Sequence, residues 1–258
     1  MMDVLLIEDD PVHRAFLKEV IEQALPECTR LLEAEDGQVG ERLALEHGVG
    51  AVVMDLQMPR RTGVEAAKAI WKDRPDTSIL FWSNYADEAY VRGISRIVPE
   101  GAAYGYVLKT ASEERLRLAL RSLFIEQQCV IDREIRGVQQ KSQDLVLGLS
   151  DTEYEVLQDI ALGLTDRAIA SRRSLSLRSV QNRLQQLYEK LGVYQPIDAF
   201  WGGHAFNLRA RAVSIALLRK LLNRNALEQA EAELQQWIND PRHNYQPRPK
   251  KPDMDRDE

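Results

Sequence analysis

The sequence predicts a parallel α/β domain in the first half of the chain and a smaller all-helical domain in the second half. Up to about residue 128, short apolar runs of strand length alternate with amphipathic helical stretches. This alternation is the pattern of strands joined by crossover helices in a doubly wound parallel sheet. From residue 149 onward the apolar residues recur at helical spacing, and turns separate the segments. A length of 258 residues is sufficient for two such domains.

Five apolar runs are predicted as the strands of the sheet. They lie at Val4–Ile7, around Leu31–Glu33, and at Ala51–Met54, Ile79–Trp82 and Tyr106–Leu108. Helices are predicted between them. The first begins at Pro11 with Asp10 as its N-cap; its expected buried face consists of Val12, Phe16, Val20 and Ile21. Further helices are predicted over 66–70 and Leu116–Phe124, and residues 129–148 are predicted as a linker because their apolar periodicity is weak.

The second domain begins with a capping box, in which Ser150 is the N-cap and Glu153 the third helical residue. A second short helix starts after Thr165, and a longer third helix ends at Gly192. Two short helices, a turn and a longer helix form a helix-turn-helix layout. The apolar side of the third helix is predicted to consist of Val180, Leu184, Leu187 and Leu191.

Beyond the third helix the sequence predicts an aromatic, glycine-containing insert at about 194–208 and a helix from about Leu208 to Leu222. A last amphipathic helix within 223–258 carries Leu227, Leu234, Trp237 and Ile238, with Asn225 as its expected cap. The prolines and charges of residues 241–258 predict a disordered tail.

The net charge of −6 is unevenly distributed along the chain. Residues 1–128 carry 15 Lys and Arg against 22 Asp and Glu, whereas residues 149–222 carry 10 against 7. Within residues 167–190 a single acid stands among six basic residues: Arg167, Arg172, Arg173, Arg178, Arg183 and Lys190. This asymmetry is typical of an acidic domain joined to a nucleic-acid-binding module, and a solvated, arginine-rich helix face would give the same pattern.

The composition excludes several classes of protein. Two cysteines, Cys28 and Cys129, cannot build a disulfide framework and indicate a reducing compartment. The apolar runs are shorter than the ~20 residues that a membrane helix requires. The first residues turn acidic at once, which is unlike a secretory signal. We therefore expect a soluble, cytoplasmic protein without a membrane partner.

Chemically complementary side chains follow four of the predicted strands. Glu8 and Asp9 follow the first, Asp55 the third, Ser83 the fourth and Lys109 the fifth. The carboxyl ends of parallel strands meet at one edge of a sheet, where ligands bind. Clustered carboxylates favour a divalent cation such as Mg²⁺, and an Asp can attack phosphorus to form an acyl phosphate. The pattern thus predicts a phosphoryl-transfer site, although each residue alone would more often be a cap, a turn residue or a surface residue.

Residues 1–128 resemble the receiver domain of bacterial two-component response regulators. The resemblance rests on Leu6–Pro11, Met54–Pro59, Ser83 and Tyr106–Lys109. It implies a five-stranded sheet of the flavodoxin type. The sequence departs from the family pattern in Thr110, where a proline often follows the lysine, and in an interval from Ser83 to Lys109 that is a few residues longer than usual.

The resemblance also implies a role for each residue of the predicted site. Asp55 would accept the phosphoryl group, and Mg²⁺ would be held by Glu8, Asp9, Asp55 and the carbonyl of Gln57. Ser83 and Lys109 would bind the phosphoryl oxygens. Tyr106 occupies the position of the switch aromatic, and a core aromatic on the last strand is nearly as well expected there.

Residues 149–222 resemble the LuxR-type output domain of the NarL/FixJ response regulators. The matching segments are Leu149–Glu153, Gly163–Thr165, Ile169–Ala170, Ser176–Val180 and Leu187–Val193. The third helix would then be the recognition helix in the major groove of double-stranded DNA. Its outward amides could bond bases, while the neighbouring basic and hydroxyl groups would bind phosphates. The base candidates are Gln181, Asn182 and Gln185, and the phosphate candidates are Arg178, Ser179 and Arg183.

The prediction is a DNA-binding transcriptional response regulator and not an enzyme. A sensor histidine kinase would phosphorylate it on Asp55, and it would bind DNA as a homodimer. One alternative is a DNA-binding regulator that works without phosphorylation, through dimer contacts, a partner or a ligand. A less favoured alternative is a Mg²⁺-dependent phosphohydrolase, which the attached helix-turn-helix argues against. The insert and the extension beyond residue 223 lie outside the resemblance.

Overall fold

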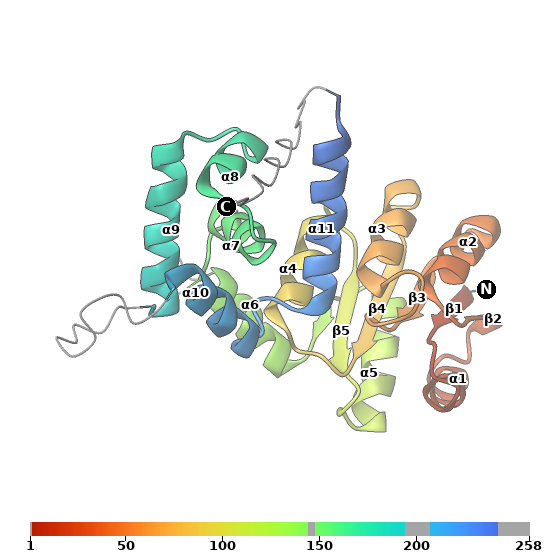
Figure 1. The fold of residues 1–258 in the computed structure, drawn as a ribbon. Coiled ribbons are helices and arrows are strands. Elements are labelled where there is room, and N and C mark those ends of the chain that lie inside the picture. The colour runs from red at the N-terminus through yellow and green to blue at the C-terminus, as the bar shows by residue number, and fades with distance from the viewer. Residues whose placement is uncertain (1, 144–147, 194–206, 242–258) are drawn as a thin grey trace, which may run out of the picture.

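The computed structural model describes residues 2–143, 148–193 and 207–241, which form two units (Figure 1). The first, here called the α/β unit, comprises residues 2–143. Its sheet has six parallel strands in the order β2-β1-β3-β4-β5-β6. The strands are β1 (Met2–Ile7), β2 (Cys28–Ala34), β3 (Ala51–Met54), β4 (Ser78–Ser83), β5 (Tyr104–Leu108) and β6 (Val130–Ile131).

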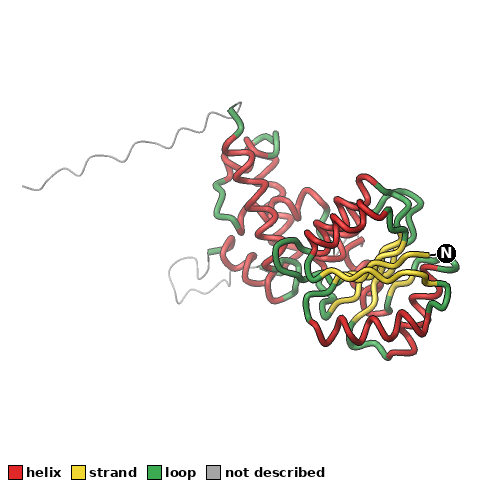
Figure 2. Tube along the Cα trace, turned by 90° about the vertical axis from the view of Figure 1, so that its right-hand side faces the viewer, coloured by secondary structure: helices red, strands yellow, loops and turns green. Residues whose placement is uncertain are grey.

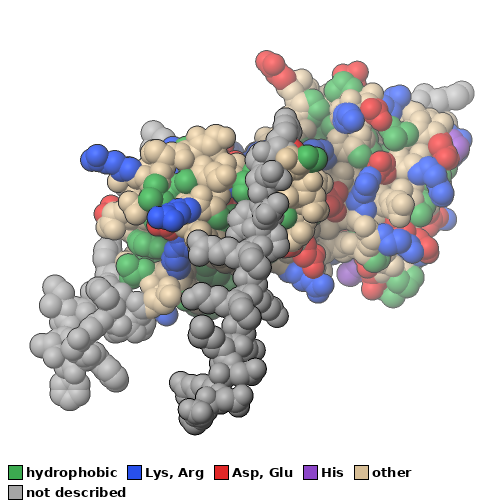
Figure 3. Space-filling model, turned by 45° about the horizontal axis from the view of Figure 1, so that its top comes forward, with side chains coloured by type: hydrophobic (Ala, Val, Ile, Leu, Met, Phe, Trp, Pro, Cys, Tyr) green, Lys and Arg blue, Asp and Glu red, His purple; other side chains and the backbone are tan. Residues whose placement is uncertain are grey.

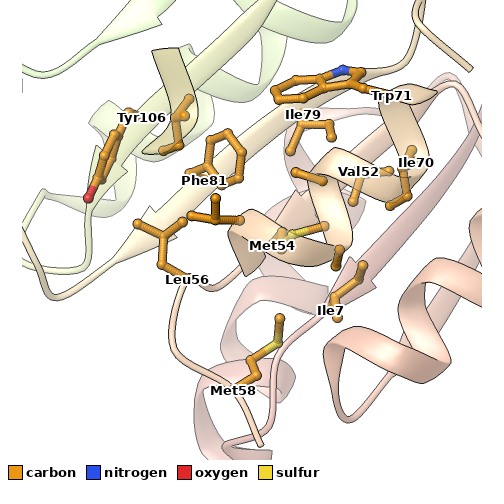
Figure 4. Close-up of a cluster of buried hydrophobic side chains, with 14 of the residues drawn as sticks. Ile7, Val52, Met54, Leu56, Met58, Ile70, Trp71, Ile79, Phe81 and Tyr106 are labelled. Atoms are coloured by element: carbon orange, nitrogen blue, oxygen red, sulfur yellow. The ribbon is translucent and has the colours of Figure 1, made fainter. Parts of the chain in front are cut away.

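Helices cover both faces of this sheet (Figure 2). They are α1 (Pro11–Ala24), α2 (Gly37–His47), α3 (Gly63–Asp73), α4 (Glu88–Ile97), α5 (Glu113–Phe124) and α6 (Arg133–Gln143). One core packs α1 and α5 against the sheet, and the other packs α2, α3 and α4. Figure 4 shows part of the second core, in which the Tyr106 ring lies next to Phe81 and close to Leu56. The predicted parallel α/β architecture is therefore confirmed.

The prediction of five strands is wrong by one. Val130–Ile131 pairs with β5 as a sixth strand, and α6 follows it with Ile135 fully buried in the α2–α4 core. The carboxylate of Asp132 accepts a hydrogen bond from the Leu108 amide at 2.9 Å. A two-residue strand has no periodicity to detect, so this part of the predicted linker carried no strand signal.

The start of α1 also differs from prediction. The side chains of Leu17, Val20, Ile21 and Ala24 are the buried ones. Val12 is 73% exposed, because the first turn of α1 extends beyond the core. Phe16 stays partly exposed and stacks on Trp82, with ring centroids 5.9 Å apart. Asp10 caps the helix as predicted, accepting hydrogen bonds from two backbone amides.

The C-terminal helical unit comprises residues 148–193 and 207–241. Its helices are α7 (Asp151–Ala161), α8 (Asp166–Arg172), α9 (Leu177–Leu191), α10 (Leu208–Leu218) and α11 (Arg224–Asn239). The predicted capping box of α7 and the predicted buried face of α9 are both present. The expected cap of α11 is wrong, since Asn223 caps it in place of Asn225. Most of the predicted insert and all of the predicted tail beyond residue 241 lie outside the described residues.

The helix α11 belongs to both halves of the molecule. Leu234 lies in the core of the C-terminal unit, while Figure 1 shows the helix standing beside α3 and α4. On the face shown in Figure 3, acidic and basic side chains are interspersed over the α/β unit. Among the described helices, none combines the length and apolar character needed to cross a membrane.

Candidate functional site

The carboxyl ends of β1 and β3 bring three acidic side chains together. Glu8 and Asp9 follow β1 and Asp55 follows β3, and one oxygen from each of the three lies within 4.8 Å of the others. The Glu8 side chain is fully buried, Asp55 is 6% exposed and Asp9 is open to solvent. Burial raises the pKa of Glu8, and the nearby Asp55 carboxylate adds to this, while hydrogen bonds from Lys109 oppose it.

Lys109, at the end of β5, joins these acids through its ammonium group. Its Nζ lies 3.0 Å from Asp55 Oδ2 and 2.9 Å from Glu8 Oε2. Burial acts to lower the pKa of Lys109, but the bonds to Glu8 and Asp55 outweigh burial and raise it. The lysine therefore stays charged, and it offsets part of the repulsion between the carboxylates.

The backbone holds Asp55 in a fixed position. Its Oδ1 accepts a hydrogen bond from the Leu56 amide at 2.6 Å, which leaves Oδ2 to Lys109. At the start of α3, Gly63 approaches so closely that a Cβ there would lie 2.1 Å from the Asp55 carbonyl oxygen. Only glycine fits this contact, so α3 begins directly behind the acid. Gln57 is exposed two residues later, and the role of its carbonyl stays a prediction.

Ser83 and Tyr106 meet in the loop that follows β4. The hydroxyl of Ser83, which is fully buried, accepts a hydrogen bond from the Tyr85 amide at 3.3 Å. The Tyr106 hydroxyl donates to the Tyr85 carbonyl at 2.5 Å, and its ring is 1% exposed. Tyr106 is therefore a core aromatic in this conformation, directed inward and tied to the same loop as Ser83.

Three residues near the acids were not identified from the sequence. His13 Nδ1, on α1, lies 3.3 Å from Lys109 Nζ, and the Trp82 ring lies 4.8 Å from the same ammonium. Arg14 donates to the Glu8 carbonyl at 2.7 Å. His13 and Arg14 lie one helical turn after the N-cap Asp10. Because this helix was predicted to begin directly after Glu8 and Asp9, the sequence could have placed its first turn beside these acids.

The second candidate surface is the outer face of α9. Arg178, Gln181, Asn182 and Gln185 are exposed there, and Ser179 and Arg183 are partly exposed. The side-chain amide of Gln185 donates to Glu189 at 3.0 Å, one turn further along the helix. All six residues predicted to contact DNA thus lie outside the core, on the single helix α9.

The basic residues of the stretch 167–190 divide into side chains that form ion pairs within the unit and side chains that lie on its surface. Arg172 and Arg173 both bind the fully buried Asp159, at 2.7 and 2.8 Å. Lys190 binds the Glu153 carboxylate at 2.8 Å. Half of the six basic residues are thus committed inside the unit. The predicted basic surface is narrower than the sequence suggested, with Arg167, Arg178 and Arg183 as its cations.

Two family models match the chain. The response regulator receiver domain matches residues 4–121, and the LuxR family of bacterial regulatory proteins matches residues 147–200. The first of these segments contains the acids and Lys109, and the second contains α9.

Known transcriptional regulators align along most of the chain. The transcriptional regulatory protein YdfI of Bacillus subtilis is 36% identical over 229 residues, covering 86% of this chain and 98% of that protein. The DNA-binding transcriptional activator DevR/DosR of Mycobacterium tuberculosis is 30% identical, over 77% of this chain and 92% of its own length. Among solved structures, RcsB of Salmonella enterica bound to a promoter has a TM-score of 0.56 at 21% identity, covering 86% of this chain and 99% of that one, and supports the fold. The chain therefore belongs to the response regulators that join a receiver domain to a LuxR-type domain, and it is a DNA-binding transcriptional regulator of a two-component system.

Proposed function

We propose that Asp55 accepts a phosphoryl group from a sensor histidine kinase and that this modification controls DNA binding through α9. The observation that carries the proposal is the position of Asp55, whose Oδ2 lies 3.0 Å from the Lys109 ammonium, in a cluster with the buried Glu8 and the exposed Asp9. A carboxylate oxygen so placed is a nucleophile beside a fixed positive charge, which is the requirement for phosphoryl transfer to an Asp.

The transfer assigns a task to each residue. Asp55 Oδ2 forms a bond to phosphorus as the bond between phosphorus and the kinase imidazole nitrogen breaks. The Leu56 amide holds the other oxygen of Asp55, so the carboxylate keeps its orientation. Lys109 exchanges its contact with Asp55 for one with the phosphoryl oxygens, and the Ser83 hydroxyl donates to another of them.

Mg²⁺ fits the donor set of this site. Glu8, Asp9 and Asp55 offer oxygen ligands only, which is the preference of a hard cation. We propose these three residues and the Gln57 carbonyl as its ligands. When bound, Mg²⁺ neutralises charge on the phosphoryl oxygens.

The signal is proposed to travel from the loop after β4 to the DNA-binding unit. When Ser83 turns to the phosphoryl group it releases the Tyr85 amide, and the Tyr85 carbonyl is also the acceptor for the Tyr106 hydroxyl.

The chain is proposed to bind DNA as a homodimer, with base contacts from Gln181, Asn182 and Gln185. We propose residues 1–128 as the receiver domain and residues 149–222 as the DNA-binding domain. The segment 129–148 connects the two, and its β6 and α6 pack on the receiver. In this scheme Asp55 is an acceptor, and the chain does not turn over a small phosphoester.

Incubation with acetyl phosphate and Mg²⁺ tests the phosphorylation site, with intact-mass spectrometry as the readout. Wild type should gain the mass of one phosphoryl group, and Asp55→Asn should not. Asp10→Asn is the matched control, since Asn keeps the cap of α1 at an exposed acid close to the site. Undiminished labelling of Asp55→Asn would refute the assignment.

A further inference from the structure

The α/β unit and the C-terminal helical unit contact each other through α4. The Arg92 guanidinium donates to the Leu149 carbonyl at 2.5 Å and to Glu88, on its own helix, at 2.7 Å. It also lies over the Tyr154 ring, 5.0 Å from the centroid. The Arg92 side chain is 8% exposed, and Tyr154 is 2% exposed. A buried cation with these partners marks an organised contact, because an unpaired buried charge is strongly unfavourable.

A second contact joins the beginning of α4 to the turn before α11. The Lys220 ammonium lies 3.5 Å from Asp87 Oδ1. Asp87 occupies the N-cap position of α4 but makes no side-chain capping bond. Its Oδ1 is buried and accepts no hydrogen bond within the described part of the chain. The Asp87 carboxylate is therefore available to pair with Lys220.

The helix α11 completes this contact and lies outside both family matches. Arg172, in the C-terminal unit, donates to the Ala230 carbonyl of α11 at 3.2 Å. A groove of about 250 Å³ separates α11 and α7 from α3 and α4, with Tyr90, Gln158, Asn223 and Gln229 among its lining residues. Interfaces between domains that are polar and incompletely packed are able to separate. Arg92 would then keep Glu88 as its partner in water.

The helix α9, proposed to read DNA, lies apart from this contact. In Figure 1, α9 lies on the side of the C-terminal unit that is remote from the α/β unit. The contacts with α4 come from the start of α7 and from Lys220, while Gln181 and Asn182 on α9 remain exposed. Leu218, at the end of α10, is also 81% exposed. Docking on α4 therefore covers neither the reading face nor this leucine.

We propose that α4 is a docking surface for the chain's own C-terminal unit, and that the chain binds DNA while docked. The second part of this proposal, DNA binding in the docked state, rests on the proposed role of α9. Phosphorylation then has no need to uncover α9, and it acts on a regulator whose reading face is already accessible. The charges on the two sides are complementary. Arg92 and Arg96 of α4 pair with Asp151, and Arg96 also lies over the Tyr154 ring. Asp87 pairs with Lys220.

Reversible cross-linking of the full chain tests the proposal. In a Cys28→Ser, Cys129→Ser background, Arg96→Cys and Asp151→Cys place two thiols where an ion pair of 3.1 Å now joins partly exposed side chains. A bifunctional methanethiosulfonate reagent should link them. The control pair combines Arg96→Cys with Gln186→Cys, on α9, and this pair should link poorly. Lys220→Asn should lower the yield and Arg219→Asn should not, with Asn chosen because Lys220 has φ 59°.

Binding to a fluorescent duplex of mixed sequence, about 30 base pairs long at low salt, is then measured by anisotropy. The cross-linked protein should bind with a Kd within about twofold of the same sample after reduction. A loss of about tenfold or more on cross-linking would overturn the inference that docking leaves the reading face free. Equal cross-linking of both pairs would overturn docking on α4. A reduced protein that fails to bind the duplex would overturn the assignment of α9 to DNA binding, and with it the proposal that the docked chain binds DNA.

Discussion

The acidic site and the reading face of α9 are built in opposite ways. At the acidic site, Glu8 is fully buried, Lys109 is held by two carboxylates and Gly63 leaves no room for a side chain behind Asp55. On α9 the side-chain amides are exposed, and the bond that Gln185 makes within the described residues is to Glu189 on its own helix. Packing therefore fixes the acidic cluster in place, whereas the side chains proposed to contact DNA lie on the surface, where a bound partner can still orient them.

The largest expected effect separates structural from DNA-binding arginines. Asp159→Ala leaves the buried Arg172 side chain and the partly buried Arg173 side chain without their shared carboxylate. We expect a loss of about 3–5 kcal/mol in the free energy of unfolding, measured by urea denaturation followed by circular dichroism. Arg167→Ala, at an exposed position earlier on α8, should change the free energy of unfolding by no more than about 0.5 kcal/mol. Similar losses in both variants would contradict the division of the basic stretch.

A second effect concerns the acidic cluster, where a cation should stabilise the folded state. At a Mg²⁺ concentration about a hundredfold above its Kd, binding adds about 2.7 kcal/mol to stability. The midpoint of thermal unfolding should therefore rise with Mg²⁺ in wild type, and much less in Asp9→Asn. Asp10→Asn, in which the neighbouring exposed acid is replaced and the cap kept, should respond like wild type. A Mg²⁺ response that survives intact in Asp9→Asn would remove that residue from the ligand set.

A third effect tests the division of labour on α9. Gln185→Ala should relax the base preference at one position of a selected operator, by about 1–3 kcal/mol of discrimination. Arg183→Ala should weaken binding to cognate and random duplexes alike and reduce the salt dependence of the Kd. Anisotropy titrations on both kinds of duplex distinguish these outcomes. If both variants lose affinity equally on both duplexes, the assignment of Gln185 to base reading is wrong.

The smallest effect is the acid sensitivity of the α7 capping box. Burial acts to raise the pKa of Glu153, but hydrogen bonds from Lys190 and Ser150 outweigh it and lower the pKa. The carboxylate therefore stabilises the fold above its ordinary pKa of 4.5, and this contribution is lost as the pH falls through the lower folded value. Glu153→Gln should abolish this part of the pH dependence, about 1 kcal/mol, in urea denaturation series. Unchanged acid sensitivity in Glu153→Gln would show that other groups control it.

The sequence was sufficient where periodicity or chain order carried the signal. Val180, Leu184, Leu187 and Leu191 are the buried side of α9 as predicted, because a helix that packs on one side must repeat its apolar residues. The acids and Lys109 could be placed together because parallel strands end at the same edge.

The remainder depends on contacts between distant segments. β6 is two residues long and forms only because β5 offers a free edge to Val130. Arg172 and Arg173 look like DNA-binding residues in a linear sequence, and only the buried Asp159, more than ten residues earlier, shows otherwise. Arg92 carried no motif at all, since its partners lie in the other unit. Contacts between segments distant in sequence determine these structures and pairings, and a local sequence pattern carries no information about such contacts.

The central claim is that phosphoryl chemistry at Asp55 controls the DNA reader on the same chain. The most direct measurement is the affinity for a selected operator duplex, with and without acetyl phosphate and Mg²⁺, in wild type and Asp55→Asn. Phosphorylation should change the operator Kd of wild type and leave that of Asp55→Asn unaltered. An equal change in both proteins, or none in a wild type shown by mass to be phosphorylated, would contradict it.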